Sequence, residues 1–422
     1  MGRRTLPGIL LMMLASAMAL RAAAPQMTAS KRLAAYAAAT PHDAIARLQR
    51  QIDAGEVTLT FDPKWGYLPS LLTALKIPAS SQSLVYSKTS FQLDKIAPSS
   101  PRAIYFGDDV YLGWVLRGTV IEVADVDPAL GAVFYTLDQQ AQATPKFERQ
   151  THNCLQCHDS VLNTGGVPGF VMQSVFIDKF GYPLPSSHDP VSNDRTPLKE
   201  KFGGWYVSGT HGADVHMGNV VPTQSVREIG NAQVYIDSLD LKATGNVTDI
   251  APRFNSKMYY RTTSDIVALS LLAHQTSVHN LMTQAAIDAG TPQADASAEA
   301  LVRGLLFIGE YTLKAPIAGA STFAADFAAL GPRDAKGRSL RLLDLKTRLM
   351  RYPLSYLIYS EGFAGLPASV KQYVARRVNE VLNGREDRAE FATMSADDRA
   401  AVREILRDTM PGFLPVQAHA SR

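Results

Sequence analysis

The chain has 422 residues, of which 46% are hydrophobic and 19% are charged. It can therefore bury sizeable cores, and its length favours two or three domains of a soluble globular protein. The formal net charge of +3 equals the contribution of Arg3, Arg4 and Arg21, all within the first 24 residues. The rest of the chain is balanced, which excludes the strongly basic character of proteins that bind nucleic acid or anionic membranes.

Residues 1–24 have the pattern of a secretory signal peptide. Arg3 and Arg4 form a basic start, Leu6 to Ala19 is nearly all apolar, and small residues between Ala17 and Ala24 provide an A-x-A-like cleavage site. The apolar run is shorter than the roughly 20 residues that span a bilayer, so cleavage is favoured over a retained anchor. We expect a bacterial periplasmic or secreted protein with no transmembrane segment after signal removal.

Residues 25–145 predict an N-terminal α+β domain. Ala34 to Ala54 reads as an amphipathic helix that is interrupted near Thr40 and Pro41. Beyond it, short runs of β-branched and aromatic residues alternate with turn residues, which is typical of strands joined by tight turns. The expected strands lie in 84–93, 104–106, 110–115, 120–123 and 130–137.

The remaining chain divides into a loop-rich region, 146–260, and a mainly helical domain, 261–422. Glycine and proline punctuate the first of these, and long irregular connections of this kind are usually functional. The second contains segments with helical periodicity, and Thr263 or Ser264 is a plausible N-cap for the first of them. The expected helices cover 264–288, 297–314, 340–350, 367–382 and 395–410. The overall fold class is α+β.

The only two cysteines of the chain lie in the sequence Cys154-Leu155-Gln156-Cys157-His158. The spacing C-x-x-C-H is the attachment signature of c-type haem. Residues i and i+3 of a helical turn share a face, so both sulfurs can form thioether bonds to one edge of the macrocycle. The histidine that follows can then supply an imidazole nitrogen as the proximal ligand of iron. We therefore expect one covalent haem c.

At this motif the chain resembles the c-type cytochromes. The resemblance covers the pentapeptide and part of the loop that follows it. In small c-type cytochromes a loop rich in glycine and proline accepts a hydrogen bond from the iron-bound histidine, and Gly165 to Gly169 is similar to that loop, with Pro168 ten residues past His158. The resemblance implies an exported electron-transfer protein.

Two other interpretations of the cysteine pair remain open. A Cys-x-x-Cys pair is also the redox centre of thioredoxin-like dithiol oxidoreductases, although those place it between a strand and a helix of a βαβ unit. A zinc site would need two further ligands. Neither context is evident around residues 147–158.

The residue on the other side of the iron decides the function. Met217 and His216 lie in a glycine-rich segment with His211, and Met217 resembles the downstream loop methionine of small c-type cytochromes. His274 and His279 lie on the predicted helix 264–288, where His274 borders an apolar stripe. Met217, His216 and His274 are the principal candidates for a distal ligand, and an open position is the alternative.

Four functions follow from these alternatives. A second protein ligand would make an electron carrier that serves a periplasmic redox partner, within a larger oxidoreductase role. An open or labile sixth position would make a haem enzyme, peroxidase-like or oxidase-like, that acts on a small-molecule substrate. A haem-containing binding or sensing protein is the third function, and a dithiol oxidoreductase without haem is the fourth. The sequence identifies no catalytic residue.

Overall fold

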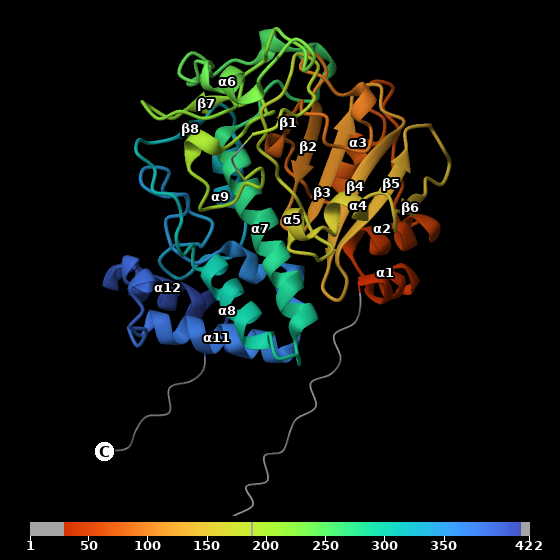
Figure 1. Ribbon diagram of the computed structural model, residues 1–422. Helices are drawn as coiled ribbons and strands as arrows, with labels where there is room; N and C mark the ends of the chain where they lie inside the picture. The colour runs from red at the N-terminus through yellow and green to blue at the C-terminus, as the bar shows by residue number, and fades with distance from the viewer. Residues whose placement is uncertain (1–28, 187–188, 415–422) are drawn as a thin grey trace, which may run out of the picture.

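A computed structural model describes residues 29–186 and 189–414 of the chain (Figure 1). The predicted signal peptide, residues 1–24, lies outside the described residues. The fold is α+β: a six-stranded antiparallel sheet occupies residues 83–149, and a helical region occupies residues 266–409. Between them the chain is dominated by loops, as expected from its glycine and proline content.

The sheet is a simple antiparallel meander in which each strand pairs with the next. Tight turns join its central strands, and Arg117 and Gly131 at two of these turns have positive φ angles of 59° and 76°. Its strands are β1 (Ser83–Val85), β2 (Arg102–Phe106), β3 (Val110–Val115), β4 (Val120–Asp127), β5 (Gly131–Asp138) and β6 (Phe147–Arg149). β6 completes the sheet just beyond the expected boundary at residue 145.

The two faces of the sheet pack against different helices because successive side chains point to opposite sides. Tyr105, Leu112 and Val133 belong to one hydrophobic core, which includes α2 (Ala44–Asp53) and α3 (Leu68–Ala74). On the other face, Tyr111 and Phe134 belong to a larger core that extends into the C-terminal helices. The sheet and the helical region therefore share one core.

The long helix α7 (Ile266–Asp288) runs beside the second face of the sheet (Figure 1). Its N-cap is Asp265, whose carboxylate accepts a hydrogen bond from Val267 N at 2.8 Å and also binds Ser321. The expectation of Thr263 or Ser264 at this position was wrong. Asp265 is favoured as the cap because its carboxylate accepts hydrogen bonds both from the first turn of the helix and from Ser321 in a neighbouring segment.

Three further helices confirm the helical periodicity: α8 (Ala294–Leu305), α11 (Ala368–Leu382) and α12 (Ala396–Thr409). The helix expected over 297–314 is too long, because α8 ends at Leu305 and Phe307 just beyond it has a φ of 54°. The expected helix over 340–350 is wrong. There the Asp344 carboxylate accepts hydrogen bonds from Thr347 N and Arg348 N, and Leu345 has a φ of 58°. Local capping of backbone N–H groups by an aspartate competes with helix formation, so this leucine-rich segment is a loop.

Short α-helices and strands make up the other α and β elements of the described chain. They are α1 (Ala29–Ala38), α4 (Leu155–His158), α5 (Val161–Thr164), β7 (Gly209–Thr210), α6 (Ala232–Asp237), β8 (Ala318–Gly319), α9 (Phe323–Ala329) and α10 (Glu361–Ala364). Among residues 29–186 and 189–414, no helix combines the length and the apolar character needed to cross a membrane.

Candidate haem-attachment site

The C-x-x-C-H motif forms a single helical turn immediately after the sheet. Cys154 is the N-cap of α4, and its carbonyl accepts hydrogen bonds from Cys157 N at 3.2 Å and His158 N at 3.0 Å. The turn lies in front of the sheet near β4 and β5 (Figure 1). Because Cys154 and Cys157 are three residues apart on this turn, their side chains leave the same side of it.

Both sulfurs are free thiols in this turn. Cys154 is half-buried and Cys157 is exposed. Burial, together with the nearby Glu122 carboxylate, raises the pKa of the Cys154 thiol to about 11. A dithiol oxidoreductase needs the opposite effect, a lowered pKa that stabilises the nucleophilic thiolate. The motif also follows an antiparallel strand rather than opening the helix of a βαβ unit.

His158 is held in one orientation by the loop that follows the motif. Its Nδ1 lies 2.9 Å from the carbonyl oxygen of Gly169, and Gly169 N donates back to the His158 carbonyl at 2.8 Å. A carbonyl oxygen can only accept, so the proton is on Nδ1 and the lone pair is on Nε2. No hydrogen bond joins Nε2 to the described residues. Burial lowers the pKa of His158, which favours the neutral imidazole.

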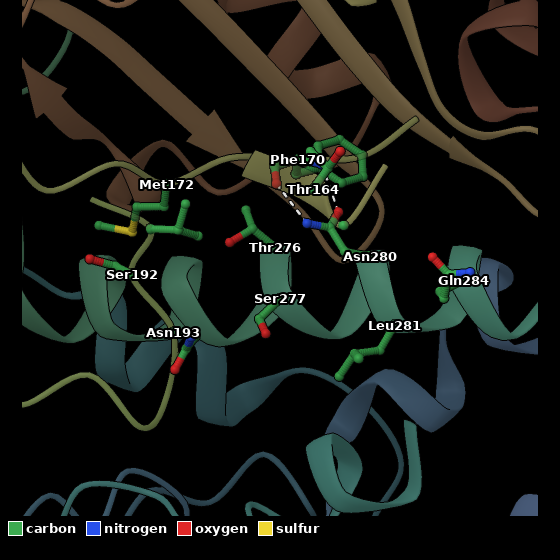
Figure 2. Close-up of a pocket in the computed structure, with 12 residues that line it drawn as sticks. Thr164, Phe170, Met172, Ser192, Asn193, Thr276, Ser277, Asn280, Leu281 and Gln284 are labelled. Carbon is green, nitrogen blue, oxygen red and sulfur yellow. Dashed lines mark hydrogen bonds between the residues drawn. The ribbon is translucent and has the colours of Figure 1, made fainter. Parts of the chain in front are cut away.

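The loop that accepts this hydrogen bond is fixed from two sides. Ala132 N at the start of β5 donates to the Pro168 carbonyl at 3.0 Å. On α7, the Asn280 side chain binds both the N–H and the carbonyl of Phe170 at 2.8 Å (Figure 2). A Cβ at Gly169 would collide with the Asn280 oxygen, so the close approach requires glycine there.

A small cavity lies between this loop and α7. Its volume is about 220 Å³, and Phe170, Met172, Thr276 and Leu281 are among the residues that line it (Figure 2). Pockets for drug-sized ligands have volumes of about 300–1,000 Å³, so a macrocycle would not fit inside this one. In α5, directly after the motif, Val161 and Leu162 are 80% and 89% exposed. Apolar surface of the kind that a large flat ligand covers therefore lies immediately after His158.

The segment with His211, His216 and Met217 lies beside β7, near the N-terminus of α7. Ser208 accepts a hydrogen bond from Ile266 N, whereas Phe170 is bound by Asn280, 14 residues further along the helix. At 1.5 Å per residue these two attachments are about 21 Å apart. The structure therefore anchors the histidine-rich segment and the loop that binds His158 at different positions along α7.

The side chains of this segment are buried and have partners there. The rings of His211 and His216 are 4.6 Å apart, and His216 Nδ1 accepts a hydrogen bond from Gly218 N at 3.0 Å. Met217 Sδ accepts from Ser174 Oγ at 3.6 Å. Burial, with His211 beside it, lowers the pKa of His216 to about 3. A sixth ligand from this segment would have to leave these contacts.

His274 on α7 is fully buried, and both of its ring nitrogens have partners. Nδ1 lies 2.8 Å from Asp194 Oδ2, Nε2 lies 2.8 Å from Ser355 Oγ, and the ring stacks on Phe307. An aspartate, a histidine and a serine hydrogen-bonded in this series also form the catalytic triad of serine hydrolases. Here, however, Ser355 is completely buried and its hydroxyl accepts a hydrogen bond from Leu357 N, so the arrangement is structural.

No family model, curated protein or solved structure matches the chain. We therefore interpret the site from its own geometry. Among the described residues, no group of three or more histidine, cysteine, aspartate or glutamate side chains is arranged to hold a metal ion by itself. Within this part of the chain, the cysteine pair has no further ligands for a zinc site.

Proposed function

We propose that the chain is an exported, periplasmic c-type cytochrome in which Cys154, Cys157 and His158 hold one covalent haem. The hydrogen bond from His158 Nδ1 to the Gly169 carbonyl carries this proposal. Metal-ligating histidines almost always donate their other ring N–H in this way, which fixes the tautomer and raises the basicity of the ligating nitrogen.

The residues present fit the requirements of the cofactor. Two free thiols leave one side of a helical turn, the imidazole that follows is neutral, and its lone pair is on Nε2. When bound, haem supplies one-electron redox chemistry at its iron. The chain's own contribution is to orient His158 through Gly169, to hold Gly169 through Asn280, and to offer apolar surface at Val161 and Leu162.

Electron transfer to a periplasmic redox partner is the first function that this site supports, within a larger oxidoreductase role. A second function, a haem enzyme with an open or labile sixth position, is favoured by one specific observation. His274 has partners at both ring nitrogens, and Met217 and His216 each accept a hydrogen bond through a potential ligand atom. None of the principal distal candidates is free to bind iron without losing a contact.

Carbon monoxide distinguishes the two functions. The protein is produced in a host that attaches haem c, reduced, and exposed to carbon monoxide while its Soret absorption is recorded. A shift of the Soret band would demonstrate an accessible or labile iron position and support the enzyme. An unchanged band in a protein that carries haem would support the electron carrier, because a strong sixth ligand excludes the gas.

A further inference from the structure

Tyr111 on β3 and His279 on α7 form a buried hydrogen-bonded pair where the sheet meets the long helix. Tyr111 Oη lies 2.9 Å from His279 Nδ1, and the two side chains belong to residues 168 positions apart in the sequence. Tyr111 is 7% exposed and His279 is 0% exposed. A phenol paired with an imidazole in a dry environment is an arrangement that can exchange a proton.

The direction of this hydrogen bond follows from the neighbouring Gln275. The Gly107 carbonyl can only accept, so the group of Gln275 that lies 2.6 Å from it is the NH₂ group. The same NH₂ group donates to Tyr111 Oη at 2.9 Å. The Tyr111 hydroxyl therefore keeps its own proton to donate to His279 Nδ1.

The other side of the His279 ring faces a carboxylate. Because Nδ1 accepts from Tyr111, the ring proton of the neutral imidazole is on Nε2. Nε2 lies 3.4 Å from Asp109 Oδ1 and, among the described residues, is buried without a hydrogen-bond partner. A carboxylate at this distance attracts positive charge on the ring. Tyr111, His279 and Asp109 are thus arranged to move one proton away from the phenol.

A chain of aromatic rings leads from this pair to His158. The His158 and Phe134 centroids are 4.7 Å apart. Phe134 is followed by Phe170 at 6.4 Å, and Phe170 is followed by Tyr111 at 4.5 Å. All of these rings are buried or half-buried in the core beside the motif. Each centroid distance between the candidate haem ligand and Tyr111 is therefore typical of packed aromatic rings.

We propose that Tyr111 is a redox-active tyrosine that gives one electron to the oxidised cofactor site while His279 takes its proton. In this step the O–H bond of Tyr111 breaks, an N–H bond forms at His279 Nδ1, and a neutral tyrosyl radical remains. The electron leaves towards His158 along Phe170 and Phe134. A haem held by Cys154, Cys157 and His158 would supply the oxidant after treatment with hydrogen peroxide, and it would take up this one electron. The proton returns when the radical is reduced again.

This inference rests on the proposed haem for its oxidant, and it deepens the peroxidase-like alternative. The alternative explanation of the same contacts is a structural network without redox chemistry. The two explanations differ in one observable, because only a redox-active Tyr111 yields a radical that is lost when its hydroxyl or its proton acceptor is removed.

The first experiment mixes the haem-containing protein with hydrogen peroxide, freezes it within milliseconds and records its electron paramagnetic resonance spectrum. We expect a tyrosyl signal that narrows when the protein is made with ring-deuterated tyrosine. Tyr111→Phe abolishes the signal and His279→Gln lowers it, because glutamine accepts a hydrogen bond but takes up no proton. Tyr105→Phe is the matched control. Tyr105 is also buried, but its hydroxyl donates to Gln82 Oε1 at 2.6 Å and has no imidazole partner.

The second experiment removes the dependence on haem. The full chain is produced in a host without cytochrome c maturation, its fold is checked by circular dichroism, and it is photo-oxidised with tris(bipyridine)ruthenium and persulfate. We expect the tyrosyl radical to depend on Tyr111 and His279 here too. A chain that never acquires haem would refute the proposed function while this experiment still tests Tyr111. A radical of equal yield in wild type and Tyr111→Phe, in either experiment, would overturn the inference.

Discussion

His158 and Asn280 hold opposite ends of one peptide group. The carbonyl of Gly169 accepts from His158 Nδ1, and the N–H that follows it, that of Phe170, donates to Asn280 Oδ1. Because the peptide unit is planar and rigid, Asn280 on α7 sets the direction from which the carbonyl approaches the imidazole. The candidate haem ligand is therefore oriented by the longest helix of the fold through a single peptide plane.

Replacing Asn280 tests this relationship. Asn280→Ala leaves the N–H and the carbonyl of Phe170 without their partner, which should lower the free energy of unfolding by about 2 kcal/mol. Urea titration followed by circular dichroism measures this change. Gln284→Ala is the control on the same helix, because the Gln284 amide donates only to Asp288. An equal loss of unfolding free energy in both variants would show that the Phe170 contacts add no stability beyond that of the Gln284 contact.

The same variant should also change the reduction potential of the bound haem. A loosened Gly169 carbonyl makes the His158 imidazole less basic and a weaker donor to ferric iron. We expect the reduction potential of the Asn280→Ala protein to be higher than that of wild type, as measured by redox titration. A lower or unchanged potential would contradict the orienting role of Asn280.

His274 should behave as a structural residue. His274→Leu leaves the Asp194 carboxylate and the Ser355 hydroxyl without the ring nitrogens that they contact at 2.8 Å, so we expect a loss of about 2–4 kcal/mol in unfolding free energy. The visible spectrum of the folded protein should be unchanged. A variant of normal stability whose Soret band shifts would instead identify His274 as the sixth ligand.

The buried carboxyl group of Glu310 should make the folding stability of the protein depend on pH. Burial raises its pKa to about 7 from the ordinary value of 4.5, and the Asp194 charge adds to the shift. The folded state thus holds this proton at pH values where the unfolded state has lost it. The stabilisation is complete below pH 4.5 and is lost as the pH rises through 7.

Glu310→Gln imitates the protonated form and keeps an oxygen to accept from Leu349 N. At pH 8 the variant should be more stable than wild type by about 1–3 kcal/mol, since one pKa unit corresponds to 1.36 kcal/mol. At pH 4 the two proteins should be equal. Thermal unfolding across this range measures the difference, with the exposed Glu361→Gln as the control. A variant less stable than wild type at pH 8 would contradict the assignment.

The sequence predicts the local parts of the fold well. The meander follows from alternating strands and turn residues, and its outline needs no long-range information. The loop ending at Gly169 could be expected to bind His158 because both lie within twelve residues of each other. The segment 340–350 shows the limit of this approach, because the hydrogen bonds of Asp344 outweigh a helical pattern of leucines.

The surroundings of the candidate site could not be predicted in the same way. Tyr111 and His279 meet only because this face of the sheet shares a core with α7, and no local pattern links them. In the sequence His274 borders an apolar stripe. Its hydrogen-bond partners, however, lie 80 positions before it and 81 positions after it. Such contacts are properties of the tertiary packing.

The intact mass of the purified chain, produced with cytochrome c maturation, tests the central claim most directly. We expect wild type to gain the mass of one haem, with the gain surviving denaturation, and we expect the Cys154→Ser/Cys157→Ser double variant to gain nothing. A wild-type chain whose mass equals that of its polypeptide alone, from a host that matures a control cytochrome normally, would contradict covalent haem attachment.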